Sequence, residues 1–212
     1  MINIQVECPK ILARSLVSYG YTTENLKLLG NGSEGAVYST NTHIFKIFFD
    51  CRKTISEEKL AFISKNFRAN EKISGVRQLS DIITDHDVLI FITPYESYTP
   101  YRGGDVENVL AILVDAKHND YIYTNFHPKN LMYDTSHKLR IIDVGRSLES
   151  YNENGYGNMI RRAFLSTYFF QRSDLVDLMS SLHRPGEVRE LIGIDKFLEK
   201  LSSKLQSKIE EN

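Results

Sequence analysis

The chain has 212 residues, of which 42% are hydrophobic and 25% are charged, so it can bury a core in one compact unit of one or two lobes. Its 26 lysines and arginines nearly cancel its 27 aspartates and glutamates, which argues against recognition of nucleic acid or an anionic membrane through overall charge. The longest apolar runs, such as residues 88–92, are too short to span a bilayer, and the N-terminus lacks a signal-peptide pattern. We therefore expect a soluble protein with no membrane span.

The chain has two cysteines, Cys8 and Cys51. They form no CxxC pair and are too few for a four-cysteine zinc site. We interpret both as ordinary thiols, which fits a reducing compartment.

The first hundred residues predict one helix, three strands, a second helix and two further strands. Ser, Thr and Asn between the second and third strands favour a tight turn, and a serine followed by two acids favours the start of the second helix. The expected helices are residues 10–19 and 56–66, and the expected strands are residues 26–30, 36–39, 43–49, 82–85 and 87–95.

The second half predicts a helix over residues 105–117, then two short strands flanking a polar loop and turn within residues 121–147, and a largely helical tail. Residues 159–179 are expected to supply buried helices. An apolar stripe at helical spacing near the end is more typical of a packing face than of a partner-binding device. The stripe consists of Phe197, Leu198, Leu201, Leu205 and Ile209.

Gly30, Gly32 and Gly35 precede Val37 in the pattern GxGxxGxV, and Lys46 follows nine residues later in an expected strand. Glycines let a backbone approach phosphates closely, and a strand lysine can then contact them. Such a motif on its own is a weak signal, because most glycine-rich spans are simple turns.

Further along, Asn125, His127 and Asn130 lie in the polar stretch "NFHPKN", and Asp143 follows in "IIDVG", thirteen residues after Asn130. Asn130 and Asp143 carry the oxygen ligands that Mg²⁺ prefers.

This order of motifs resembles the protein-kinase-like superfamily, which includes protein kinases, aminoglycoside and choline kinases, and very small bacterial effector kinases. The resemblance extends over residues 28–147 and implies an α+β, two-lobed fold in a single minimal kinase-like domain. The N-lobe, residues 1–96, would hold a five-stranded antiparallel sheet. The C-lobe, residues 97–212, would be truncated and mostly helical.

The resemblance also implies roles for individual residues. The glycine loop, Val37, Lys46 and Tyr95 would bind ATP, with Lys46 on the phosphates. An acid of the helix at residues 56–66 would pair with Lys46; Glu58 is the first choice and Glu57 stays open. Mg²⁺ would be held by Asn130 and Asp143, and Val144 would replace the usual phenylalanine after the metal-binding aspartate.

One residue departs from the superfamily pattern. The position of the catalytic aspartate, five residues before Asn130, holds Asn125. An amide cannot accept a proton from a hydroxyl nucleophile, although it can still orient one. A slow kinase, a pseudokinase that only binds nucleotide, and a deliberate inactivating substitution all remain open. His127, where kinases place a lysine or histidine against the transferred phosphate, is a candidate for substitute acid–base chemistry.

We therefore expect an ATP- and Mg²⁺-dependent phosphotransferase, a minimal protein serine/threonine kinase that acts on a protein substrate. An activating protein partner is a further expectation, as is a location in the cytoplasm or, after secretion, in a host cell. The alternatives are a nucleotide-binding scaffold and a small-molecule kinase. "FHPKN" is closer to the motif of aminoglycoside and choline kinases, but those enzymes use a larger helical lobe than this chain provides.

Overall fold

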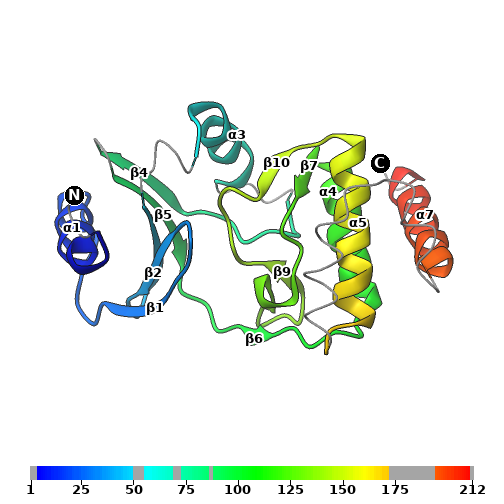
Figure 1. The fold of residues 1–212 in the computed structure, drawn as a ribbon, viewed down its shortest axis with the longest axis horizontal. Helices are drawn as coiled ribbons and strands as arrows, with labels where there is room; N and C mark the ends of the chain where they lie inside the picture. The colour runs from blue at the N-terminus through cyan, green and yellow to red at the C-terminus, as the bar shows by residue number, and fades with distance from the viewer. Residues whose placement is uncertain (1–3, 50–54, 69–72, 86–87, 172–193, 211–212) are drawn as a thin grey trace. The chain divides into compact units, whose positions relative to one another are not determined.

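A computed structural model describes residues 4–49, 55–68, 73–85, 88–171 and 194–210. The chain divides into two compact units (Figure 1). The N-terminal unit comprises Met1–Asn70 and Gln78–Glu96, and the C-terminal unit comprises Glu71–Arg77 and Ser97–Asn212. The predicted lobes met at residues 96 and 97; in the structure, the short segment Glu71–Arg77 also groups with the C-terminal unit. Among the described helices, none has the length and apolar character needed to cross a membrane.

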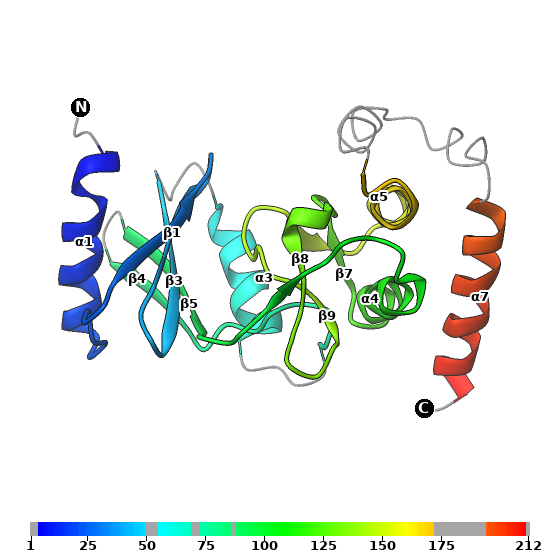
Figure 2. The ribbon, with the colours of Figure 1, turned by 90° about the horizontal axis from the view of Figure 1, so that it is seen from below.

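The N-terminal unit is built on a five-stranded antiparallel sheet, as the sequence predicted. The strand order is β1–β2–β3–β5–β4. The strands are β1 (Lys27–Asn31), β2 (Gly35–Ser39), β3 (His43–Phe48), β4 (Asp81–Asp85) and β5 (Val88–Pro94). Two helices, α1 (Ile4–Ser18) and α3 (Glu57–Phe67), flank this sheet on opposite sides (Figure 2).

The core of this unit lies between α1 and one face of the sheet. Leu12 and Leu16, one helical turn apart on α1, are fully buried. They pack against alternate residues of neighbouring strands, which point to the same face because the side-chain period of a strand is two. The buried strand residues of this cluster are Ala36, Tyr38, Phe45, Ile47, Ile83, Ile90 and Ile92.

The predicted turn and helix start are both confirmed. In the β2–β3 turn, the Thr40 hydroxyl accepts the backbone N–H of His43 at 3.2 Å, and the Thr40 N–H donates to the His43 carbonyl at 2.9 Å. Ser56 caps α3 by accepting the Lys59 N–H at 3.3 Å. The N-terminal unit therefore follows local sequence signals closely.

The described part of the C-terminal unit contains three long helices and several short strands. Its helices are α4 (Val106–His118), α5 (Glu153–Tyr168) and α7 (Ile194–Glu210), with a 3₁₀ turn η1 at Pro128–Asn130. Its strands are β6 (Thr99–Pro100), β7 (Tyr121–Tyr123), β8 (Leu131–Tyr133), β9 (Leu139–Ile141) and β10 (Leu148–Ser150). They form an antiparallel β6–β8–β9 sheet and an antiparallel β7–β10 pair.

Both α5 and α7 pack against α4 (Figure 1). The Tyr156 hydroxyl of α5 donates to the Leu113 carbonyl of α4 at 2.9 Å. The helices α5 and α7 also contact each other, with the ring centres of Phe164 and Phe197 5.7 Å apart. The apolar stripe of the tail is only partly a packing face, because Phe197 and Leu201 are buried whereas Ile209 is 74% exposed. Of the helices predicted over residues 159–179, α5 supplies the first part, and residues 172–179 lie outside the described residues.

One glycine of the loop motif is required by the fold. A Cβ atom at Gly35 would lie 2.1 Å from the carbonyl oxygen of Ile47 on the paired strand, far inside van der Waals contact. A Cβ at Gly30 would meet nothing within 4 Å. Gly35 therefore serves close strand packing, whereas packing does not explain Gly30.

We expect Gly35→Ala to lower the free energy of unfolding by about 1–3 kcal/mol, because β2 and β3 must move apart to admit the methyl group. Gly30→Ala, the matched control, should change it by less than about 0.5 kcal/mol. Urea denaturation of the two variants beside the parent protein measures both values. Equal stabilities for the two variants would contradict this account of the glycines.

Candidate functional site

The predicted site residues fall into two groups, one in each unit. The N-terminal unit holds the glycine loop and Lys46, and the C-terminal unit holds the loop from Asn125 to Asn130 together with Asp143.

The glycine loop joins β1 to β2 and is closed by backbone hydrogen bonds. The Gly32 N–H donates to the Gly35 carbonyl at 2.9 Å, and the Phe49 N–H, just after β3, donates to the Glu34 carbonyl at 2.9 Å. Like Gly30, Gly32 has open space where a Cβ would stand. Bare backbone facing open space fits a loop that a phosphate can approach closely.

Strand register places Lys46 on the sheet face opposite the α1 core. Lys46 pairs with Val37 across β2 and β3, while its neighbours Phe45 and Ile47 point into the core. The Lys46 Nζ lies 3.1 Å from the Glu34 Oε2 and 4.9 Å from the centre of the Phe48 ring. The Lys46 and Glu34 side chains are only 13% and 14% exposed. The predicted phosphate-binding lysine is therefore held by a carboxylate from the glycine loop.

Lys46 pairs with Glu34 and not with either of the acids that the resemblance implied. Glu58 and Glu57 are both exposed in the first turn of α3, and within the described part of the chain neither forms an ion pair with Lys46. The buried face of α3 passes through Ile63 and Phe67. At about 100° per residue, Glu58 lies about 140° around the helix from Ile63, so it points to solvent and favours the helix dipole instead.

The two remaining nucleotide-binding predictions, Val37 and Tyr95, also lie in the N-terminal unit. Val37 is half-buried beside Lys46 on the face away from α1. Tyr95 follows β5 and is 50% exposed, and its N–H donates to the Thr42 carbonyl at 2.8 Å. Their roles toward a nucleotide stay predictions.

In the C-terminal unit, the loop after β7 is anchored on both sides. The Thr124 N–H and hydroxyl donate to the Ser147 carbonyl at 2.8 Å and 3.2 Å, next to the β7–β10 pair. Phe126 is fully buried, and its carbonyl accepts the Ser166 hydroxyl of α5 at 3.2 Å. The backbone on either side of Asn125 is therefore fixed by the fold.

Asn125 itself has a half-buried side chain that makes no hydrogen bond to the described residues. Its backbone carbonyl accepts the Asn130 Nδ2 at 3.1 Å. Since the Asn125 side-chain amide does not hold the loop in place, the loop does not require asparagine at this position.

His127 adopts an extended backbone and caps η1, with its Nδ1 accepting the Lys129 N–H at 3.2 Å. A neutral imidazole that accepts at Nδ1 carries its proton on Nε2. In this tautomer, Nε2 is a hydrogen-bond donor and has no lone pair with which to accept a proton. The geometry therefore disfavours His127 as a substitute base and suits it to contact an anionic oxygen.

The β8–β9 hairpin brings Asn130 and Asp143 to the same end. Leu131 pairs with Ile141, and the Ile142 N–H donates to the Asn130 carbonyl at 3.0 Å, so Asp143 follows directly after this bond. The side chain of Asn130 is buried, and its Nδ2 donates to the Asn125 carbonyl, which fixes the orientation of the amide and leaves Oδ1 on the side away from this hydrogen bond. Val144, the residue after Asp143, is buried and apolar, as predicted.

The donor set at this hairpin end fits Mg²⁺. One amide oxygen and one carboxylate are hard ligands, and Mg²⁺ commonly takes one or two protein ligands and completes its shell with water and phosphate oxygens. The described residues contain no group of three or more histidines, cysteines or acids that could form an all-protein metal site. Asn130 and Asp143 therefore suit a metal that arrives with a phosphate ligand.

The other end of the hairpin is fixed by Asp134. Its carboxylate accepts the N–H groups of Ser136 and Lys138 at 2.8 Å and 3.0 Å, and the Nε of Arg140 at 2.8 Å. Burial acts to raise the pKa of Asp134, but the hydrogen bonds from Lys138, Arg140 and Ser136 outweigh it and lower the pKa below its ordinary value. The ionised carboxylate therefore stabilises the hairpin that carries Asn130 and Asp143.

We expect Asp134→Asn to cost about 1–3 kcal/mol at pH 7, because hydrogen bonds to a charged acceptor are lost. Since the folded pKa lies below the unfolded value, this contribution is present above the unfolded pKa and disappears as pH falls through the folded pKa. The stabilities of parent and variant should therefore converge as the pH falls through the folded pKa of Asp134. Denaturant unfolding at pH 7 and at a series of acidic pH values tests this, and a stability difference that does not narrow with acid would refute it.

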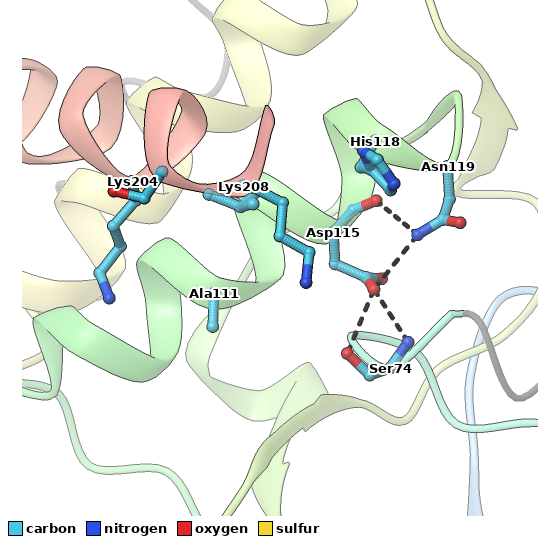
Figure 3. Close-up of a pocket in the computed structure, with 9 residues that line it drawn as sticks. Ser74, Ala111, Asp115, His118, Asn119, Lys204 and Lys208 are labelled. Carbon is cyan, nitrogen blue, oxygen red and sulfur yellow. Dashed lines mark hydrogen bonds between the residues drawn. The ribbon is translucent and has the colours of Figure 1, made fainter. Parts of the chain in front are cut away.

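A separate hollow of about 410 Å³ lies in the C-terminal unit, lined by residues of α4, α7 and Ser74 (Figure 3). The Asp115 carboxylate points to Ser74 and accepts its N–H at 2.9 Å and its hydroxyl at 3.1 Å; it also accepts the Tyr121 hydroxyl at 2.8 Å. Lys204 of α7 forms an ion pair with Glu107 at 2.7 Å. None of the predicted site residues lines this hollow, and its carboxylate is occupied in fastening the segment at Ser74 to α4.

The antiparallel five-stranded sheet and the helical second unit define an α+β, protein-kinase-like fold. Among solved structures, the chain is similar to a double mutant of the PknI kinase domain from Mycobacterium tuberculosis, with a TM-score of 0.51 and 11% sequence identity. The alignment covers 88% of this chain and 98% of that domain. No protein-family model and no curated protein sequence matches the chain. At this identity the likeness shows the fold, and the function must be argued from the residues.

Proposed function

We propose that this protein is an ATP- and Mg²⁺-dependent phosphotransferase with a slowed chemical step, acting on serine or threonine of a protein substrate. The observation that carries the proposal is the hairpin end at which Asn130 and Asp143 meet, joined to the loop of Asn125 by the side chain of Asn130. In a kinase-like fold, this pairing would supply metal ligands next to a loop that faces the substrate.

The roles follow from the chemistry of each group. The backbone of the glycine loop and the ammonium of Lys46 would bind the phosphates, with Val37 and Tyr95 against the base. Asn130 and Asp143 would hold Mg²⁺, which neutralises charge on the phosphates when bound. His127 would donate its Nε2–H to an oxygen of the transferred phosphate.

Asn125 would orient the acceptor hydroxyl through its amide without removing the proton. Phosphoryl transfer depends mainly on positioning and charge stabilisation, so loss of the base should slow the reaction without abolishing it. A nucleotide-binding scaffold is the second candidate, and the absence of a carboxylate at Asn125 is the observation that favours it.

Nucleotide binding is tested by Lys46→Ala and Asp143→Ala. We expect ATP with Mg²⁺ to raise the melting temperature of the parent, since a ligand at a hundredfold its dissociation constant stabilises by about 2.7 kcal/mol. Lys46→Ala should lose most of this shift with or without Mg²⁺, whereas Asp143→Ala should lose only the Mg²⁺-dependent part. Thermal unfolding with ATP and either Mg²⁺ or EDTA measures the shifts. Unchanged shifts in both variants would exclude these two residues from the site.

The catalytic role is tested by Asn125→Asp. Because the Asn125 side chain does not hold the loop, a carboxylate can replace it at the same volume and supply the missing base. We expect phosphate transfer to rise by about 10²- to 10⁴-fold at unchanged ATP affinity. The assay follows radiolabelled ATP with the protein alone, with a generic protein acceptor and with an aminoglycoside, which separates a protein kinase from a small-molecule kinase. ATP binding without any gain in turnover would favour the scaffold.

A further inference from the structure

Glu34 lies at the tip of the glycine loop, in the segment that closes between β1 and β2. Its carbonyl is held by the Phe49 N–H, and its carboxylate by Lys46 at 3.1 Å. The acid therefore bridges from the loop to the strand that carries the lysine. All these atoms belong to the N-terminal unit.

The ion pair is sheltered from solvent. The two side chains are 13% and 14% exposed, and the ring of Phe48 lies beneath the Lys46 ammonium. Exposed ion pairs contribute little because water screens them, and a sheltered pair is screened less. The Glu34 carboxylate therefore competes effectively for the lysine.

The competing ligand would be a phosphate group. A phosphate oxygen and the Glu34 carboxylate oxygen can each bind the Lys46 ammonium, and the two anions repel each other in a sheltered site. A ligand whose phosphates bind Lys46 must then displace Glu34. A ligand without phosphates has no such requirement.

We propose that the Glu34 carboxylate competes with phosphate groups for Lys46. This competition lowers the affinity of the protein for nucleoside di- and triphosphates and leaves its affinity for the unphosphorylated nucleoside almost unchanged. This inference rests on the proposed function, because it assumes that Lys46 binds phosphates. The glycine loop would then have a second role, because its Glu34 carboxylate occupies Lys46 until a phosphorylated nucleotide displaces it.

The test replaces the carboxylate by an amide of the same shape. Glu34→Gln should bind ADP with Mg²⁺ about three- to tenfold more tightly than the parent, while its affinity for adenosine stays within about twofold. Glu24→Gln, an exposed acid of the same unit, is the matched control and should leave both affinities unchanged. Calorimetry or competitive displacement gives the dissociation constants, and melting temperatures verify folding.

A double variant assigns the gain to the lysine. If Glu34 acts through Lys46, adding Glu34→Gln to Lys46→Ala should bring much less gain in ADP affinity than Glu34→Gln brings to the parent. Labelling of Lys46 with an amine-reactive reagent, without nucleotide, should be faster in Glu34→Gln than in Glu24→Gln, because the shielding carboxylate is gone.

The outcomes separate the two proposals. If the parent binds ADP and Glu34→Gln binds it equally or more weakly, the role of Glu34 is refuted while the proposed function stands. The role of Glu34 is refuted in the same way if ADP and adenosine gain affinity alike, or if labelling of Lys46 is equal in the two variants. If no variant binds ADP or adenosine, the proposed function fails and this inference fails with it.

Discussion

The pairing of β2 with β3 is the constraint on which both the core of the N-terminal unit and the position of its proposed phosphate-binding residues depend. Because side chains alternate between the faces of a strand, the register that buries Phe45 and Ile47 under α1 also turns Lys46 to the other face, opposite Val37. A slip by one residue would bury the ammonium in an apolar core and expose two large apolar side chains. The same hydrophobic burial that stabilises the sheet therefore fixes where the lysine stands.

In the C-terminal unit, the register of the β8–β9 hairpin likewise fixes where Asn130 and Asp143 lie. The bond from Ile142 to the Asn130 carbonyl ends the β8–β9 ladder, and the chain delivers Asp143 beside it. Asn130 then uses its amide nitrogen on the Asn125 carbonyl, so one side chain both anchors the loop and presents an oxygen. The positions of Asn130 and Asp143 are therefore a consequence of strand pairing, and the buried Val144 holds the chain after Asp143.

The sequence predicted the sheet, the α3 cap and the β2–β3 turn, because each depends on local periodicity or on local turn and capping residues. It did not predict β6 or β10, since strands of two or three residues carry no periodic signal. It also failed for the lysine's partner. Glu34 and Glu58 each lie twelve residues from Lys46. Spacing could not choose between them, and the choice depends on which face of α3 is buried.

Glu34 and Asn125 both alter charge where the proposed chemistry is sensitive to it, and in opposite senses. Glu34 adds an anion next to the proposed phosphate-binding lysine, while Asn125 lacks one where the proposed reaction needs a proton acceptor. Glu34 would affect the binding of phosphates in the ground state, whereas Asn125 would affect the transfer step. Their effects would therefore appear in different kinetic constants. Neither side chain is needed to hold the backbone, since the Glu34 carbonyl is held by Phe49 and the Asn125 side chain bonds to no described residue. In the proposed function, the fold would therefore keep the other site residues in place, while these two side chains would set how tightly phosphates bind and how fast one is transferred.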